Sequence, residues 1–132
     1  MTKPIVLVVE EEALIRMSAV HMIEDAGYAA VEACNADEAI GILEKLRDIR
    51  AVFTDISMSG SMDGLKLAHS IRNRWPPIHL ILTSGLNMQD KLPPNGRFVG
   101  KPYTAEDVTK ALNELLGHSP DGENGYKRAK VA

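Results

Sequence analysis

The sequence has little of three things: cysteine, aromatic side chains and long apolar runs. Its only cysteine is Cys34, which excludes an internal disulfide and a cysteine-ligated zinc site. No apolar stretch approaches the roughly 18 residues that a bilayer-spanning helix needs. The first apolar run, from Ile5 to Val9, is too short for a signal sequence and is followed by three glutamates. We therefore expect a cytoplasmic protein with no membrane partner.

Positive charge is also scarce. Lysine and arginine total 15 against 18 aspartates and glutamates, so the formal net charge is −3 and the pI is about 5.8. Nucleic-acid binding surfaces neutralise phosphates with clustered lysine and arginine, so this balance argues against a nucleic-acid partner. The hydrophobic share of 45% is ordinary for a globular domain with a real core. We expect one domain over residues 1–117 and a disordered tail over 118–132, which is rich in breakers and lacks periodicity.

Short apolar runs alternate with segments whose apolar residues recur at helical spacing. The expected strands are 5–9, 28–33, 51–55, 78–83 and 97–100. The expected helices begin after Glu12, at Ala36, at Asp63 and after Thr104, while residues 86–95 allow at most one or two helical turns. Glutamates are expected in the first turn of the first helix, where they suit its dipole, and the second helix is expected to end near Asp48.

This alternation predicts βαβ crossovers and therefore a parallel sheet. The fold class that we expect is α/β, a doubly wound five-stranded parallel sheet of the flavodoxin-like type with strand order 2-1-3-4-5. The carboxyl ends of its strands would share one edge, where ligands bind in open α/β sheets. Polar side chains that could act on a ligand stand at those strand ends: Glu10, Glu11, Asp55, Thr83, Ser84 and Lys101.

These groups are suited to binding phosphate together with a hard cation. Clustered carboxylates do not all ionise cheaply unless a cation is near, and oxygen ligands suit Mg²⁺, which keeps places for a phosphate ligand. A lysine and a hydroxyl group suit phosphoryl oxygens. A carboxylate can itself accept a phosphoryl group. We therefore expect a site of binding and transfer around Asp55.

The order of these motifs resembles that of bacterial response-regulator receiver domains of the CheY-like type, over about residues 4–116. The stretches that carry the resemblance are Val8-Val9-Glu10-Glu11, Thr54 to Gly60, Asp63-Gly64, Leu82-Thr83-Ser84-Gly85 and Lys101-Pro102. The resemblance implies a phosphoryl-accepting receiver of a two-component or phosphorelay system, a signalling domain rather than an enzyme. It implies a sensor histidine kinase or phosphotransfer protein as donor and an unknown downstream protein as target. We expect a stand-alone receiver, because the chain ends soon after its last expected helix.

The resemblance also implies a role for each site residue. Asp55 would be the phosphoacceptor, and Mg²⁺ would be bound by Glu10, Glu11, Asp55 and the backbone carbonyl of Ser57. The phosphoryl group would be bound by Thr83, Ser84 and Lys101. Phe98 would be the aromatic residue that turns inward on activation, and the peptide before Pro102 would be cis.

Two residues depart from the family's usual pattern. Glu11 stands where the family usually has aspartate, which is one methylene shorter. Because Mg²⁺ demands near-octahedral geometry, the metal would shift, a water would intervene or the affinity would drop. Ser59 stands where proline is common, and we expect it to loosen the loop after the acceptor. The interval from Thr83 to Lys101 is also shorter than in many relatives, which predicts a short or degenerate fourth helix.

Other interpretations of these residues stay open. Glu10 and Glu11 could serve only the helix dipole, Asp55 could cap a turn, and Lys101 could be a solvated lysine. The domain could then be a phosphorylation-independent protein-binding module with a degraded metal site at Glu11. A flavin or nucleotide carrier on the same architecture is disfavoured, because the first loop lacks a glycine-rich phosphate cradle and only 5% of residues are aromatic.

Overall fold

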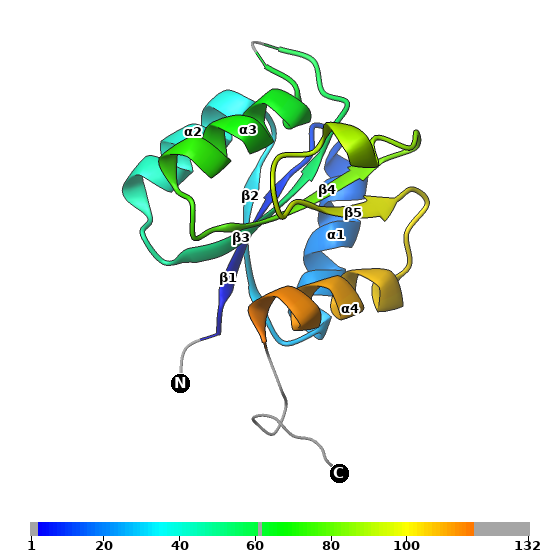
Figure 1. Cartoon of the computed structure of the whole chain (residues 1–132). Coiled ribbons are helices and arrows are strands. Elements are labelled where there is room, and N and C mark those ends of the chain that lie inside the picture. The colour runs from blue at the N-terminus through cyan, green and yellow to red at the C-terminus, as the bar shows by residue number, and fades with distance from the viewer. Residues whose placement is uncertain (1–2, 61, 118–132) are drawn as a thin grey trace.

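The computed structural model describes residues 3–60 and 62–117, and these form one five-stranded parallel sheet with helices on both faces (Figure 1). The predicted tail over 118–132 lies outside the described residues. The sheet has the predicted order β2-β1-β3-β4-β5, which confirms the expected fold class. Its strands are β1 (Ile5–Val9), β2 (Ala29–Ala33), β3 (Ile49–Asp55), β4 (His79–Ser84) and β5 (Arg97–Gly100). The helices in these residues are α1 (Ala13–Asp25), α2 (Ala36–Lys45), α3 (Gly64–Arg74), the 3₁₀ turn η1 (Gln89–Lys91) and α4 (Ala105–Leu116).

Two apolar layers hold the sheet between its helices. The layer with α2 and α3 contains Leu7, Val9, Val52, Leu80, Leu82, Ala39, Leu43, Leu67 and Ile71. The layer with α1 and α4 contains Val6, Val8, Ala51, Phe53, Ile81, Ala19, Ile23, Val108 and Leu112. Successive strand residues therefore enter opposite layers, as the pleat of a strand requires. This two-sided burial explains why the central strands are continuous apolar runs rather than alternating ones.

Side-chain caps fix three of the helix starts that the sequence predicted. The side chain of Asn35 accepts a hydrogen bond from the Glu38 N–H at 2.8 Å, and Asp63 accepts one from the Lys66 N–H at 2.9 Å. Thr104 and Asp107 form a reciprocal capping box at the start of α4. Each cap satisfies an amide that would otherwise lack an intrahelical acceptor.

Some details of the predicted elements were wrong. α1 begins at Ala13, after Glu12 as predicted, but its first turn contains no acidic residue, because the three glutamates precede the helix. The carboxylate of Glu10 turns back to accept the Glu12 N–H at 3.0 Å, which keeps this segment in the loop after β1. α2 ends at Lys45 rather than near Asp48, because Leu46 is already extended, and β3 then begins at Ile49, two residues before the prediction. β2 begins one residue later than predicted, and β4 is shifted by one residue.

The helix predicted between β4 and β5 is short, as expected, because this connection contains only the 3₁₀ turn η1. A side chain from α3 holds it in place. The guanidinium of Arg72 donates to the carbonyl of Pro94 at 2.9 Å, and also to the carbonyls of Pro76 and Ile78 at 2.8 and 2.9 Å. Met88 and Leu92 of this connection pack against the apolar layer beneath. None of the helices in residues 3–60 and 62–117 combines the length and hydropathy that crossing a bilayer requires.

The first residue of α3 packs directly on the backbone of the strand that bears Asp55. The Gly64 N–H donates to the carbonyl of Ile56 at 2.9 Å, and a Cβ added to Gly64 would lie 1.8 Å from the backbone oxygen of Asp55. The atoms that such a Cβ would clash with belong to the backbone of Asp55 and Ile56, so they cannot move aside as a flexible side chain could. Only glycine therefore lets α3 begin this close to the end of β3.

We expect Gly64→Ala to lower the free energy of unfolding by about 2 kcal/mol or more, because backbone must shift to admit the methyl group. Urea denaturation at neutral pH measures this. Gly41→Ala is the matched control, since nothing lies within 4 Å of its added Cβ inside α2, and it should raise stability by about 0.5–1 kcal/mol. Equal effects of the two substitutions would contradict the packing account.

Candidate functional site

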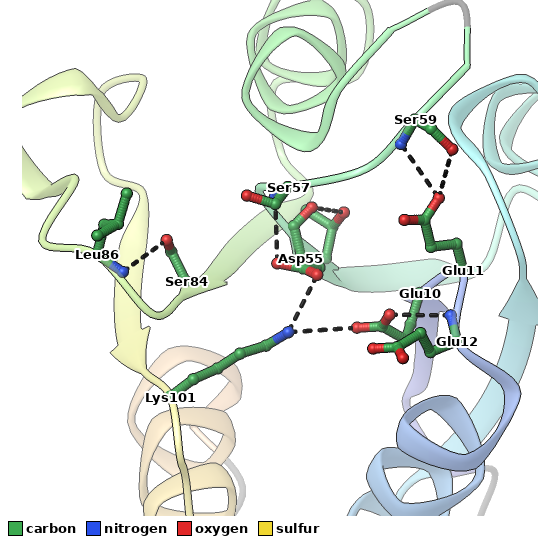
Figure 2. A network of polar contacts seen from close by, with 10 residues as sticks. Glu10, Glu11, Glu12, Asp55, Ser57, Ser59, Ser84, Leu86 and Lys101 are labelled. Carbon is green, nitrogen blue, oxygen red and sulfur yellow. Dashed lines mark hydrogen bonds and ion pairs between the residues drawn. The ribbon is translucent and has the colours of Figure 1, made fainter.

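Parallel register brings the predicted polar residues to one edge of the sheet (Figure 2). Asp55, the last residue of β3, lies opposite Thr83 of β4 in the register of the sheet. Lys101 follows β5, and its backbone N–H donates to the carbonyl of Ser84 at 2.9 Å. Glu10 follows β1 and its N–H donates to the carbonyl of Ala33 at 3.1 Å. Backbone hydrogen bonds thus fix the position from which each of these side chains starts.

The centre of the site is an ammonium group between two buried carboxylates. Lys101 Nζ lies 3.0 Å from Asp55 Oδ2 and 3.6 Å from Glu10 Oε1. Asp55 is 8% exposed and Glu10 is 5% exposed, so both carboxylates have lost most of their hydration. The peptide between Lys101 and Pro102 is cis. Two carboxylates and one ammonium leave this edge with a net negative charge, which favours the binding of a further cation.

Burial governs the protonation equilibria of this group. It raises the pKa of Glu10; the hydrogen bond from the Glu12 N–H opposes the rise, the charge of Asp55 adds to it, and Lys101 opposes it. Burial would by itself lower the pKa of Lys101, but the hydrogen bond and charge of Asp55, with the charge of Glu10, raise it. Lys101 therefore remains an ammonium that lies close to both carboxylates.

Both oxygens of the Asp55 carboxylate have donors. Oδ1 accepts the Ser57 N–H at 3.2 Å, while Oδ2 accepts from Lys101 Nζ. Thr83 is buried, and it is the partner of Asp55 in the register of the sheet. Ser84 is also buried, and its hydroxyl oxygen accepts the Leu86 N–H at 3.0 Å. The Asp55 carboxylate is therefore oriented by the Ser57 amide on one side and by the Lys101 ammonium on the other.

Glu11 lies apart from this group. Its Oε1 accepts hydrogen bonds from the Ser59 N–H at 3.1 Å and from the Ser59 hydroxyl at 2.8 Å. These hydrogen bonds, the hydroxyl one first, lower the pKa of Glu11. Figure 2 shows this carboxylate turned towards Ser59, whereas that of Glu10 faces Lys101. The structure thus joins Glu10, Asp55 and Lys101, and turns the Glu11 carboxylate towards Ser59 in the loop after Asp55.

Phe98 also lies outside the charged group. It is half-buried on β5, opposite Leu82 in the register, and packs against the apolar layer on the α2 and α3 side. Tyr103, two residues after Lys101, packs its ring edge to face against Phe53 at a centroid distance of 5.5 Å. Tyr103 was not singled out from the sequence, although its place directly after Lys101-Pro102 was a usable signal.

Arg16 is a further residue that the sequence did not reveal. Its Nη1 donates to the carbonyl of Glu10 at 2.8 Å and its Nε to Glu32 at 2.9 Å, so it fixes the loop that carries Glu10. No spacing rule could have found it, since its partners lie on the loop before α1 and on β2.

The donor set has the chemistry of a Mg²⁺ site, in part. The carboxylates of Glu10 and Asp55 and the carbonyl of Ser57 are all hard oxygen donors, and Mg²⁺ binds through one or two carboxylates while keeping several waters. The two buried carboxylates also need more positive charge than Lys101 alone supplies. In the described part of the chain, however, no three acidic, histidine or cysteine side chains gather closely enough to hold a metal together. Two carboxylates fit the ion, and the third is engaged elsewhere.

Comparison with known proteins shows the family to which the chain belongs. A family model described as "response regulator receiver domain" matches residues 6–113. The sensor kinase CckA of Brucella abortus is 32% identical over 117 residues, which cover 84% of this chain and 12% of the relative. The aerobic respiration control protein ArcA of Escherichia coli K12 is 30% identical over 125 residues, 90% of this chain and 51% of the relative. The chain thus spans about half or less of the length of these relatives.

Solved structures give the same result. The crystal structure of the receiver domain of the hybrid histidine kinase CckA matches with a TM-score of 0.71 and 25% identity, covering 85% of this chain and 98% of that one. The receiver domain of NtrX from Brucella abortus matches with a TM-score of 0.76 and 27% identity, covering 86% and 99%. With the family match over most of the sequence and the fold in agreement, the chain belongs to the family of response regulator receiver domains of two-component systems.

Proposed function

We propose that Asp55 accepts a phosphoryl group in a Mg²⁺-dependent reaction, from the phosphohistidine of a sensor histidine kinase or of a phosphotransfer protein. The observation that supports this most is the fixed Asp55 carboxylate, with the Ser57 amide on Oδ1 and the Lys101 ammonium on Oδ2. A carboxylate held by directed donors is already oriented for attack, so less of the barrier is spent on positioning.

In the proposed transfer, a carboxylate oxygen of Asp55 attacks phosphorus and forms the P–O bond of an acyl phosphate. The P–N bond to the donor imidazole breaks, and the imidazole leaves with the electron pair. Lys101 would pair with a phosphoryl oxygen, and the Thr83 and Ser84 hydroxyls would donate to others from the neighbouring strand end. Bound Mg²⁺ would supply positive charge that offsets the carboxylates and the phosphoryl oxygens.

The chain's own residues would bind the Mg²⁺ ion, and the phosphorylated state would end by hydrolysis. Glu10, Asp55 and the Ser57 carbonyl would hold Mg²⁺, with Glu11 as the remaining carboxylate. Hydrolysis of the acyl phosphate would return the domain to its starting state. The domain is then a signalling receiver that assists only its own phosphorylation and dephosphorylation, in the cytoplasm, and not an enzyme with other substrates.

The proposed output is a change of binding surface around β5. The phosphoryl group would draw Thr83 and Lys101 towards Asp55, and the half-buried Phe98 would turn further inward. The surface formed by β5 and residues 86–96 would then bind a downstream protein differently. The short β4–β5 connection held by Arg72 is part of that surface.

A second function is favoured by one observation, the engagement of Glu11 with Ser59. If Glu11 never joins the metal site, the domain could bind partners without phosphorylation. Calorimetric titration with Mg²⁺ separates the two functions, because a constitutive module of this kind would show no binding, whereas a receiver would bind the ion at its acidic edge.

The phosphoacceptor can be tested by mass. Incubation of the chain with acetyl phosphate and Mg²⁺ should add one phosphoryl group, measured on the intact protein, and Asp55→Asn should add none because it lacks the nucleophile. Asp90→Asn is the matched control, since Asp90 is an exposed aspartate of η1, and it should be phosphorylated like the wild type. Addition that survives Asp55→Asn would refute the assignment.

The crowding of buried carboxylates predicts a pH-dependent stability. The pKa of Glu10 is raised by burial above its usual value of 4.5, so its charged form is less favourable in the folded state than in the unfolded chain. In chelator-treated buffer, Glu10→Gln should therefore be more stable than the wild type at pH 7. Below pH 4.5 the glutamate is protonated in both states, and the advantage should vanish.

Urea denaturation of both proteins across this pH range measures the effect. Glutamine can still accept the Glu12 N–H, so the loop contact is retained. A glutamine variant that is less stable at pH 7, or a difference that does not change with pH, would contradict the account.

A further inference from the structure

Glu11 and Ser59 join two loops that flank the proposed phosphoacceptor. Glu11 belongs to the loop between β1 and α1, and Ser59 to the loop between β3 and α3. One carboxylate oxygen of Glu11, Oε1, accepts both the N–H and the hydroxyl of Ser59, at 3.1 and 2.8 Å. We call this pair of hydrogen bonds the Glu11–Ser59 latch.

The latch depends on the identity of both residues. A proline at position 59 would offer neither an N–H nor a hydroxyl. An aspartate at position 11 would be one methylene shorter than the side chain that now reaches across. Glu11 and Ser59 are in contact through the N–H and hydroxyl of Ser59, so the two residues form one feature rather than two separate ones.

The latch competes with the proposed metal site for the same carboxylate. Glu10 and Asp55 face Lys101, while Glu11 faces Ser59 (Figure 2). Within residues 3–60 and 62–117, no group of three acidic side chains is close enough to share an ion. Glu11 would complete such a group only after its carboxylate turned away from Ser59.

We propose that Ser59 sets the divalent-cation affinity of this receiver by holding Glu11 out of the metal site, and that the latch must open for Glu11 to bind the ion. Ser59 acts through Glu11 and is a positioning residue. This inference rests on the proposed Mg²⁺ site. When only a fraction of molecules has the competent arrangement, the apparent affinity falls by that fraction, so weakening the latch tightens binding.

The size of the effect follows from the number of donors removed. Ser59→Ala removes the hydroxyl donor, and Ser59→Pro removes both donors. One hydrogen bond of ordinary net strength corresponds to a change of about threefold to tenfold in an equilibrium constant. Because Glu11 and Ser59 are exposed, the lower end applies, about threefold tighter Mg²⁺ binding for alanine and a larger gain for proline.

Isothermal titration of the full chain with Mg²⁺ alone, without phosphodonor, tests this. The series is the wild type, Ser59→Ala, Ser59→Pro and Ser18→Ala, an exposed serine on α1 that serves as the matched control. The proposal expects affinity to rise in the order wild type, alanine, proline, with Ser18→Ala equal to the wild type. Unchanged or weaker binding in both Ser59 variants would overturn it, and weaker binding would mean that Ser59 instead presents Glu11 to the ion.

A second measurement does not depend on affinity. The backbone amide resonance of Ser59 reports the latch directly, and Glu11→Ala gives its position when the latch is absent. Saturating Mg²⁺ should move the wild-type resonance towards that position. A Ser59 amide that is the same in Glu11→Ala and in the metal-free wild type would show that there is no latch.

The outcomes separate this inference from the proposed function. Tighter Mg²⁺ binding in the Ser59 variants together with no phosphorylation of Asp55 would sink the proposed function and leave the latch. Normal phosphorylation of Asp55 together with wild-type Mg²⁺ affinity in both Ser59 variants would support the proposed function and refute the role of the latch.

Discussion

The site depends on one interaction, the contact of the Lys101 ammonium with the buried carboxylates of Asp55 and Glu10. Two carboxylates that are each less than a tenth exposed would repel one another strongly without it. The ammonium makes the arrangement stable enough to exist in the folded protein and still leaves an excess of negative charge. That excess of negative charge supports the proposed binding of a divalent cation at this edge.

The fold delivers these three groups from distant parts of the sequence. Lys101 is 46 residues from Asp55 along the chain, and they meet because β3, β4 and β5 are parallel neighbours whose carboxyl ends share one edge. Gly64 then lets α3 begin against the backbone of Asp55 itself. The same close packing that stabilises the domain therefore fixes the position of Asp55, and a substitution that disturbs one disturbs the other.

Periodicity and end signals were enough to predict most of this framework. The apolar run of β1 and the capping residues Asn35, Asp63 and Thr104 are local features, so they can be recognised without knowledge of the fold. The meeting of Asp55 with Lys101 followed from topology. What escaped prediction were side chains whose partners are set by the path of a loop: Arg16 on the Glu10 carbonyl, Arg72 on Pro94, and Ser59 on Glu11. Glu11 and Ser59 were both singled out from the sequence, but nothing in either residue alone indicated that their side chains are in contact.

The most direct test of this account is the pKa of the Lys101 ammonium, measured by nitrogen-detected NMR in chelator-treated wild type and in Asp55→Asn. The account predicts a pKa above the ordinary lysine value of 10.5 in the wild type, because Asp55 and Glu10 outweigh burial. It predicts a clear fall in Asp55→Asn, where burial remains and the main opposing charge is gone. An ordinary lysine pKa that is the same in both proteins would contradict the claim that one charged network organises this edge.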